Sequence, residues 1–583
     1  MAPSLINGGK VIISTATKNL QDQLFNKDIP KIREALNIPV KVNLLKGRSN
    51  YICQLKMEDA DEGAQFINKE DGSYLEKIKQ FSNHSDSGEI SEVKGVPEVS
   101  TIWPMVTSNA DHCLGQSCEF SKSCFFLKAR REALNAEVVI VNHHLFFADF
   151  VLRKEEISEL LPKPNTVVFD EAHQVPDVAS IFFGNNFSTS EILYLIQDTQ
   201  LLFEKIGINK KKFVTHFSET TEQIRKIRSF FPPNNNRITF EKIENSEDFT
   251  DHIQSLSKAI NDMDKALSLL DDHSPEQKKI LERFADINQK IAPWLHEKSK
   301  NFVYWLDIFS KSIQFNMTPF SVAESFDKFR EDNDVAWIFT SATLAVNDSF
   351  NFFQNLMGLK EANSKKLDSP FNFKDNACLY VPSDMPEPNT PVFNLALIKK
   401  IYPLIEAAKG RTFILSTSLK GMKEISALLK DALEKKELKF PVLTQGDDSK
   451  SLLIDQFKSN GNAILIGSMS FWEGIDVRGP LLSLVIIDKL PFQSPGDPVF
   501  ESKINRLKDL GDNPFMNFQL PKAIISLKQG AGRLIRDEVD KGVLMICDPR
   551  IIQKPYGKRI WKSLPPFKRT RREIDVTDFL KSL

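Results

Sequence analysis

Short apolar runs alternate with helical patterns over most of this chain. Residues 10–16 predict a buried strand, and residues 17–36 show the apolar spacing of a helix. The other predicted strands cover residues 137–142, 166–170, 335–340, 412–416, 463–467, 483–488 and 542–547. Continuous apolar runs bounded by loops are typical of parallel strands buried on both faces. Because strands and helices alternate in two separate blocks, we expect two doubly wound α/β domains.

Two stretches interrupt this alternation. Residues 40–130 are irregular and hold four of the six cysteines. Residues 186–330 contain long segments with apolar residues at helical spacing, such as 191–205 and 249–270. We therefore expect a cysteine-bearing insertion and a mostly helical insertion.

The composition changes this picture only a little. At 583 residues the chain is too long for one core, and its net charge of −1 means that any nucleic-acid contact must come from local basic patches. The basic run at 568–572 is interpreted as a solvated tail. No segment has the apolar length of a membrane span and the N-terminus lacks a signal-peptide pattern, so we expect a soluble, cytoplasmic protein without membrane contact.

An acidic tetrad follows one of the predicted strands. Asp170-Glu171-Ala172-His173 comes directly after the apolar run 166–169. In phosphoryl-transfer sites an Asp at a strand end holds Mg²⁺, and a neighbouring Glu orients the attacking water. An ordinary acidic turn would give the same four residues, so the tetrad needs support from elsewhere in the chain.

Two glycine-containing segments in the second block give that support. Gln529-x-x-Gly532-Arg533-x-x-Arg536 places two arginines three apart, which predicts that both lie on one face of a helix. Such arginines can stabilise charge on a transferring phosphate. Residues 472–479 follow the strand 463–467, and their glycines allow close approach of the backbone to a ligand. A surface helix and a tight loop are the simpler alternatives.

Four cysteines lie in the first insertion. They are Cys53, Cys113, Cys118 and Cys124, whereas Cys378 and Cys547 sit in apolar, strand-like runs and are expected in the core. Their wide, uneven gaps suit an iron–sulfur cluster better than the paired spacing of a zinc site, although spacing alone leaves both open.

A phosphate-binding loop is absent from these 583 residues. The sequence G-x-x-x-x-G-K followed by Ser or Thr, whose backbone N–H groups and Lys hold the phosphates, does not occur. The nearest candidate is Gly8-Gly9-Lys10, but Val11 follows and the segment leads into a strand instead of a helix.

Taken together, these motifs resemble the XPD-like iron–sulfur helicases of superfamily 2, and among them the bacterial DinG/YoaA type. The resemblance covers nearly the whole chain, and the joint order of the motifs is specific. The matching segments are 14–24 (motif Ia), 46–53 (entry to the cluster segment), 141–143, 170–173 (motif II), 341–343 (motif III), 468–479 (motif V) and 529–536 (motif VI).

The resemblance implies a domain organisation. Two RecA-like α/β domains would be formed by residues 1–45, 131–185 and 331–385 and by residues 386–583. An iron–sulfur cluster domain would span 46–130, and a helical arch domain would span 186–330.

The resemblance also implies an activity, which is ATP-dependent 5′→3′ unwinding of duplex DNA in repair or replication. Single-stranded and forked DNA would be substrates, replication or repair proteins possible partners, and the protein a monomer. ATP would be used with Mg²⁺, and the four insertion cysteines would hold a 4Fe–4S cluster. The implied roles are Mg²⁺ binding by Asp170; catalysis by Asp170, Glu171, His173, Gln529, Arg533 and Arg536; nucleotide sensing by Gly474 and Asp476; and DNA-backbone contact by Thr17 and Gln23.

The missing phosphate loop separates two hypotheses. In the first, the sequence is an N-terminally truncated helicase and these residues alone do not hydrolyse ATP. In the second, it is a natural non-catalytic short form that binds DNA or a partner. Asp170, Glu171, Arg533 and Arg536 together favour the first, because none of them is needed without a nucleotide. A zinc-stabilised binding module would fit the cysteines but would leave motifs II, V and VI unexplained.

Overall fold

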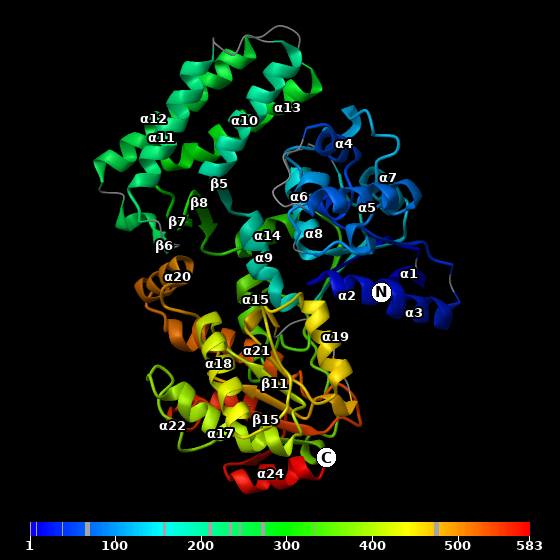
Figure 1. The fold of residues 1–583 in the computed structure, drawn as a ribbon, viewed down its shortest axis with the longest axis vertical. Helices are drawn as coiled ribbons and strands as arrows, with labels where there is room; N and C mark the ends of the chain where they lie inside the picture. Colours follow the sequence, from blue (N-terminus) through cyan, green and yellow to red (C-terminus); the bar gives the residue numbers. More distant parts are fainter. Residues whose placement is uncertain are drawn as a thin grey trace. The chain divides into compact units, whose positions relative to one another are not determined.

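The chain folds into two units, each containing a parallel β-sheet (Figure 1). The computed structural model describes all residues except 1, 7, 38, 64–69, 99, 155–158, 208–212, 233–235, 244–245, 270–273, 332, 472–476 and 478. The first unit comprises residues 1–340, 356–358 and 494–510, and the second comprises 341–355, 359–493 and 511–583. The prediction of two parallel-sheet α/β units is confirmed.

The parallel sheet of the first unit has the order β2-β3-β1-β4-β9. Its central strand β1 is fully buried, which explains the apolar run Val11-Ile12-Ile13 with which it begins. Aliphatic side chains such as Ile13 and Ile140 cover one face, whereas Phe169 stacks with Trp337 and Phe339 on the other. The strands are β1 (Val11–Thr15), β2 (Val42–Leu44), β3 (Val138–Asn142), β4 (Thr166–Asp170) and β9 (Ala336–Thr340).

The helix predicted after β1 is confirmed, with one irregularity. It runs as α2 (Lys18–Gln23), a π-helical turn (Leu24–Asp28) and α3 (Ile29–Leu36). Pro30 lies at the start of α3, where its missing N–H coincides with the widened turn. Asn37 ends the helix in the left-handed conformation.

The cysteine-bearing segment is more ordered than its sequence pattern indicated. It contains α4 (Gln54–Gly63), α5 (Asp71–His84), α6 (Trp103–Val106) and α7 (Phe125–Leu134). The buried Lys46 lies at its entry, and its Nζ is 3.1 Å from the carboxylate of Asp22 and 2.6 Å from that of Glu89. This cation joins α2 to the segment.

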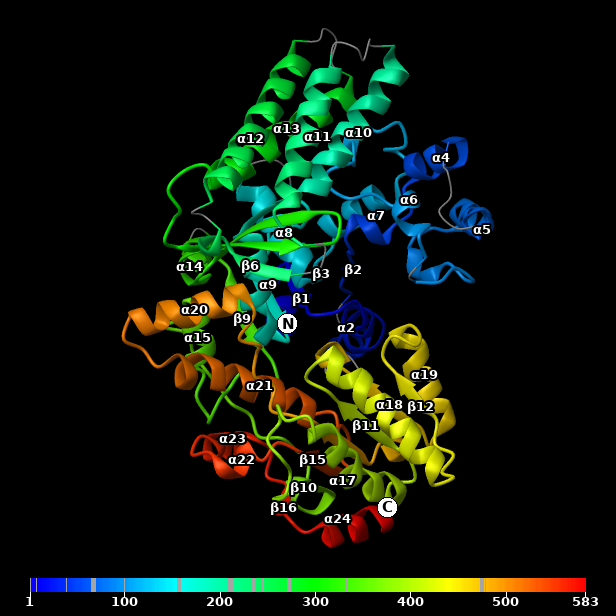
Figure 2. The same cartoon turned by 60° about the vertical axis from the view of Figure 1, so that its left-hand side comes forward.

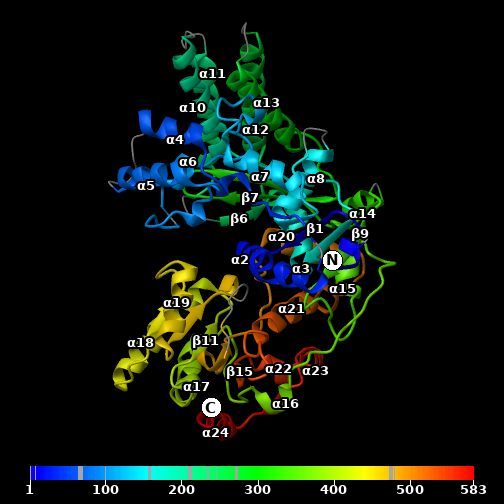
Figure 3. The same ribbon diagram turned by 90° about the vertical axis from the view of Figure 1, so that its right-hand side faces the viewer.

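The helical insertion contains a sheet that the sequence analysis missed. Its antiparallel order is β5-β8-β7-β6, formed by β5 (Asn185–Ser188), β6 (Asn236–Thr239), β7 (Phe302–Ile308) and β8 (Ile313–Pro319). The apolar run of β7 does not by itself distinguish a strand from a buried helix. Figures 2 and 3 show the four long helices running together from this sheet. They are α10 (Thr189–Ile206), α11 (Val214–Ser229), α12 (Glu247–Ser268) and α13 (Pro275–Ile291).

The second unit contains a seven-stranded parallel sheet of order β12-β13-β11-β14-β15-β10-β16. Its strands are β10 (Ala377–Tyr380), β11 (Thr412–Leu415), β12 (Val442–Thr444), β13 (Ile464–Gly467), β14 (Leu484–Ile487), β15 (Gly542–Ile546) and β16 (Lys568–Thr570). Helices such as α17 (Phe393–Ala407), α18 (Leu419–Lys435) and α19 (Lys450–Asn460) connect them.

Two expectations about the second unit were wrong. The sequence-based boundary after residue 385 placed residues 377–380 in the first domain, but β10 pairs with β15 and β16. The basic run at 568–572 is not simply a tail, because its first three residues form the edge strand β16. The run 568–570 is polar and too short for hydrophobic periodicity to assign, and the strand-like run around Cys378 does not by itself indicate which sheet it joins. Among the described residues, no helix is both long and apolar enough to cross a membrane.

Candidate functional site

The acidic tetrad forms a sharp turn at the carboxyl end of β4. Asp170 ends the strand, and Glu171 has a left-handed backbone conformation with φ 51° and ψ 44°. The Asp170 carboxylate accepts a hydrogen bond from Thr15 Oγ1 at 3.1 Å, and His173 Nδ1 lies 3.3 Å from Glu171 Oε2. Burial, followed by the charge of Glu171, raises the pKa of Asp170. A cation beside this carboxylate would offset both effects.

A buried histidine, His143, lies beside this turn and was not predicted as a site residue. His143 Nδ1 is 2.7 Å from Ser14 Oγ at the end of β1, and both residues are buried. Burial lowers the pKa of His143 to about 4, so the ring is neutral at neutral pH. Hydrogen bonding of the ring to the backbone of Asp170 and Glu171 acts in the opposite direction on this pKa, so the ring lies against the acidic turn. With Thr15, this contact joins the end of β1 to the region of the acidic turn.

The two residues predicted to contact DNA lie on the helix after β1. Thr17 is the N-cap of α2, and its Oγ1 accepts a hydrogen bond from the N–H of Leu20 at 3.3 Å. Gln23 is exposed and donates to Asp28 Oδ2 at 3.2 Å. Only Ala16 separates Thr17 from Thr15, whose hydroxyl group donates to Asp170.

The four insertion cysteines share one neighbourhood. All are half-buried, and none forms a disulfide. Burial raises the pKa of Cys53, with smaller contributions from the other three thiols; the N–H of Lys56 donates to its sulfur. Burial also raises the pKa of Cys118, whose sulfur accepts from the N–H of Phe120. Within the described part of the chain, no three His, Cys, Asp or Glu side chains converge as they would on a single metal ion.

The two predicted arginines of the second unit do not lie on a helix as expected. Helix α21 (Leu520–Ala531) contains Gln529 but ends before Arg533. Arg533 Nε donates to the Gln529 carbonyl at 3.2 Å, from the turn that begins at Gly532. Arg536 lies farther along, in a loop. Since Gly532 is the C-cap, the i, i+3 spacing continues past the helix without helical geometry.

A buried aspartate organises this loop and was not predicted. Asp540 Oδ2 accepts hydrogen bonds from the N–H groups of Arg536 and Asp537 at 2.8 and 2.9 Å. Its Oδ1 accepts from the N–H of Gly479 at 2.8 Å. Asp540 therefore joins the ends of the two predicted motifs, whereas Gly474 and Asp476 lie outside the described residues.

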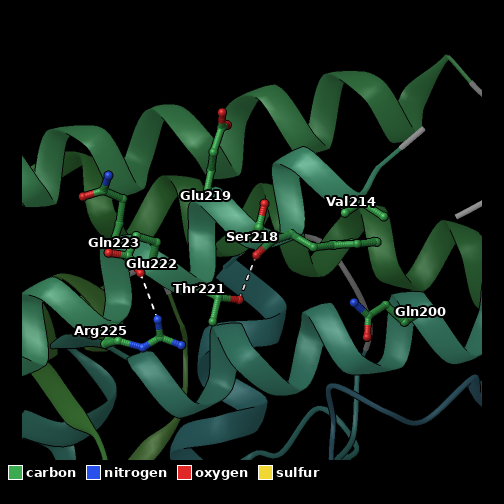
Figure 4. Close-up of a pocket in the computed structure, with 9 residues that line it drawn as sticks. Gln200, Val214, Ser218, Glu219, Thr221, Glu222, Gln223 and Arg225 are labelled. Carbon is green, nitrogen blue, oxygen red and sulfur yellow. Dashed lines mark hydrogen bonds and ion pairs between the residues drawn. The ribbon is translucent and has the colours of Figure 1, made fainter. Parts of the chain in front are cut away.

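A separate pocket of about 660 Å³ lies on the outer helices of the insertion (Figure 4). Its lining includes Gln200, Val214 and Phe217, and an ion pair of 3.0 Å between Glu222 and Arg225. None of the predicted site residues lines it. The pocket therefore adds nothing to the candidate site.

Comparison with known proteins identifies similar sequences and folds. Residues 401–567 match the model of the helicase C-terminal domain. The chain is 39% identical to the ATP-dependent DNA helicase YoaA of Escherichia coli and 37% identical to that of Haemophilus influenzae, in each case over its whole length and 90% of the relative. It is 30% identical to the ATP-dependent helicase DinG of Mycobacterium tuberculosis over 89% of that protein.

A solved XPD helicase has a similar fold. The TM-score is 0.57 at 17% identity, and the likeness covers 97% of this chain and 93% of that one. At this identity the likeness concerns the fold alone. It agrees with the predicted RecA-like architecture.

Proposed function

This chain belongs to the family of ATP-dependent DNA helicases that includes YoaA and DinG, and from this premise we propose that it is built to move 5′→3′ on single-stranded DNA and to unwind forked duplexes. The supporting observation is the hydrogen bond from Thr15 to Asp170. It connects the turn suited to Mg²⁺ and nucleotide with the helix that begins after Thr17. DNA repair or replication is the process that this activity would serve.

The proposed roles follow from the chemistry of each group. Asp170 holds the Mg²⁺ of ATP, and Glu171, with His173 beside it, orients the attacking water. Arg533 and Arg536, with Gln529, stabilise the charge that develops on the transferred phosphate. Thr17 and Gln23 contact the DNA backbone, and Gly474 and Asp476 sense the nucleotide.

The two insertions receive separate roles in this proposal. Residues 46–130 form a cluster domain in which Cys53, Cys113, Cys118 and Cys124 hold a 4Fe–4S cluster, and residues 186–330 form an arch. The four thiols share one neighbourhood, and their wide, uneven spacing in the sequence suits a multi-iron cluster better than zinc. The N–H groups that point at two of the sulfurs are typical of such sites.

The metal content tests the cluster. Purified protein is expected to be brown and to contain equal amounts of iron and acid-labile sulfide. Cys118→Ser should lose the colour, whereas the control Cys378→Ser, at a buried thiol of the second sheet, should keep it. Zinc without visible absorbance, or a Cys118→Ser protein that keeps its full iron content, would contradict the proposal.

The 583 residues contain no phosphate-binding loop, which bears on their ability to hydrolyse ATP. We infer that a protein of these 583 residues alone releases negligible phosphate from ATP, because no group in the sequence replaces the loop. Robust DNA-stimulated turnover by the pure protein would refute this inference. In a form joined to a phosphate-loop segment, Arg533→Ala and Glu171→Gln should abolish turnover while DNA binding persists, and near-normal rates would refute the assigned roles.

A further inference from the structure

One helix is connected at both ends to strands of the second sheet but does not pack on that sheet. Helix α20 (Pro498–Asp509) lies between β14 and β15 along the chain, yet residues 494–510 belong to the first unit. Exposed residues 493–496 precede it, and the exposed Leu510 and Gly511 follow it. Gly511 has φ +74°, a conformation that favours glycine. The helix thus has its contacts in one unit and its covalent connections in the other.

Helix α20 lies beside β6 and β7 of the insertion (Figures 1 and 2), and charged contacts attach its first half. Asp497 Oδ2 lies 3.5 Å from Arg237 Nη1 on β6, and Glu501 Oε2 lies 3.5 Å from Lys242 Nζ. The other oxygen of Asp497 accepts the N–H of Phe500 at 2.9 Å. Asp497 therefore caps α20 and pairs with the insertion at the same time.

Arg506 attaches the second half of the helix. Its guanidinium group stacks on Phe320 at 4.4 Å and donates a hydrogen bond to the carbonyl of Lys300. Pro498 and Phe500 are buried, so α20 also packs through apolar side chains. Contacts near both ends fix the direction of the helix as well as its position.

The receiving surface is already ordered by contacts within the insertion. Arg237 is 3.2 Å from Asp307 on β7 and lies over the ring of Trp305 at 5.4 Å. A guanidinium group held in this way loses little freedom when Asp497 approaches. The residues of the insertion sheet that contact α20 are therefore already held in place by other contacts.

We propose that α20 is a strap by which the second unit holds the helical insertion, so that a displacement of the second unit is transmitted to the insertion. The docking stands on the contacts of α20 alone. The transmission rests on the proposed helicase function, in which the nucleotide cycle moves the second unit.

Hydrogen exchange of the 583-residue protein tests the docking. Arg506→Ala is expected to raise the exchange rate of the α20 amides about ten-fold, because a cation–π contact and a hydrogen bond are lost. The control Asn505→Ala, at an exposed position of the same helix, should leave the rate unchanged. Unchanged exchange in Arg506→Ala, or an equal rise in α12, would overturn the strap.

A charge swap gives an independent check. Lys242→Glu and Glu501→Lys should each raise α20 exchange about three-fold, and the double variant should return toward wild type. Additive effects in the double variant would contradict the pairing. This test remains informative if Arg506→Ala fails to fold.

A longer connector tests the transmission. Gly-Gly-Ser inserted between Leu510 and Gly511 should leave α20 docked but abolish any change in α12 exchange caused by single-stranded DNA. A change that persists overturns the transmission. If the wild-type protein binds no single-stranded DNA, the proposed function and the transmission fail together, and the exchange of α20 still decides the docking.

Discussion

The carboxyl ends of the two parallel sheets both carry aspartates, but the two sets are built differently. In the first unit Asp170 is half-buried beside Glu171 and accepts a hydrogen bond from Thr15. In the second unit Asp488 and Asp548 are 1% and 0% exposed. Asp488 accepts from Ser416 and from two backbone N–H groups, and Asp548 accepts from Leu490 and forms a bidentate pair with Arg550.

This difference separates a structural carboxylate from one that is suited to bind a ligand. Fully buried carboxylates with several donors tie neighbouring strand ends together. Asp170 instead lies beside the like charge of Glu171, which adds to the effect of burial in raising its pKa and disfavours its charged form until a cation approaches. Aspartates at the carboxyl ends of the strands therefore stabilise the fold of the second unit, whereas in the first unit Asp170 is suited to bind a cation.

The strongest test compares Asp548→Ala with Asp170→Ala. Removing Asp548 leaves the largely buried Arg550 without its partner, so the free energy of unfolding of the second unit should fall by about 3–5 kcal/mol. Removing Asp170 costs one hydrogen bond but relieves the repulsion from Glu171, and the change should stay below about 1 kcal/mol. Urea denaturation, with hydrogen exchange in each sheet, measures both.

Equal losses in the two variants would contradict the comparison. Asp548→Asn is a useful intermediate, because its amide oxygen can still accept the N–H of Leu490 but the charge opposite Arg550 is gone. Its loss should lie between those of the two alanine variants.

The sequence predicts most of the central strands of both sheets and the edge strand β9, but it does not predict the edge strands β2, β12 and β16. β1, β4, β11 and β15 each contain an unbroken run of at least three apolar residues because their faces are largely buried, and this pattern appears directly in the sequence. The edge strand β16 consists of Lys568, Arg569 and Thr570, whose polar side chains show no such signal. The insertion sheet was missed because its strands lie among long amphipathic helices.

The titration of Asp488 makes the stability of the second unit depend on pH. Burial raises the pKa of Asp488 from 3.8 to about 6, although its hydrogen bonds act in the opposite direction. The folded state holds this proton more tightly than the unfolded state does. The contribution to stability is therefore complete below pH 3.8, and about 3 kcal/mol is lost as the pH rises through 6.

Asp488→Asn removes this titration. Relative to the variant, wild-type protein should lose up to about 3 kcal/mol of unfolding free energy between pH 4 and 7.5 in urea denaturation. Parallel pH profiles for the two proteins would show that Asp488 does not titrate differently on folding.

The motifs predicted the candidate catalytic residues, but they did not predict the residues that contact these side chains and hold them in place. Asp170 and Glu171 stand out because an acidic pair ends an apolar run. Thr15 ends β1 and His143 directly follows β3, and only the parallel pairing of β1 with β3 and β4 brings both to the acidic turn. Asp540 likewise needs the fold to meet Gly479.

The smallest expected difference in unfolding free energy is between two variants that each remove a hydroxyl donor to a strand-end aspartate. Ser416 Oγ donates to Asp488 at 2.8 Å in a buried site, and Thr15 Oγ1 donates to Asp170 at 3.1 Å in a partly open one. Ser416→Ala should cost about 2 kcal/mol of unfolding free energy, because a buried acceptor loses a donor that water cannot replace. Thr15→Val should cost less than about 1 kcal/mol, because water can reach the half-buried carboxylate. Denaturation of the two variants under identical conditions measures the difference, and a reversed order would mean that the first sheet depends on Asp170 for its stability.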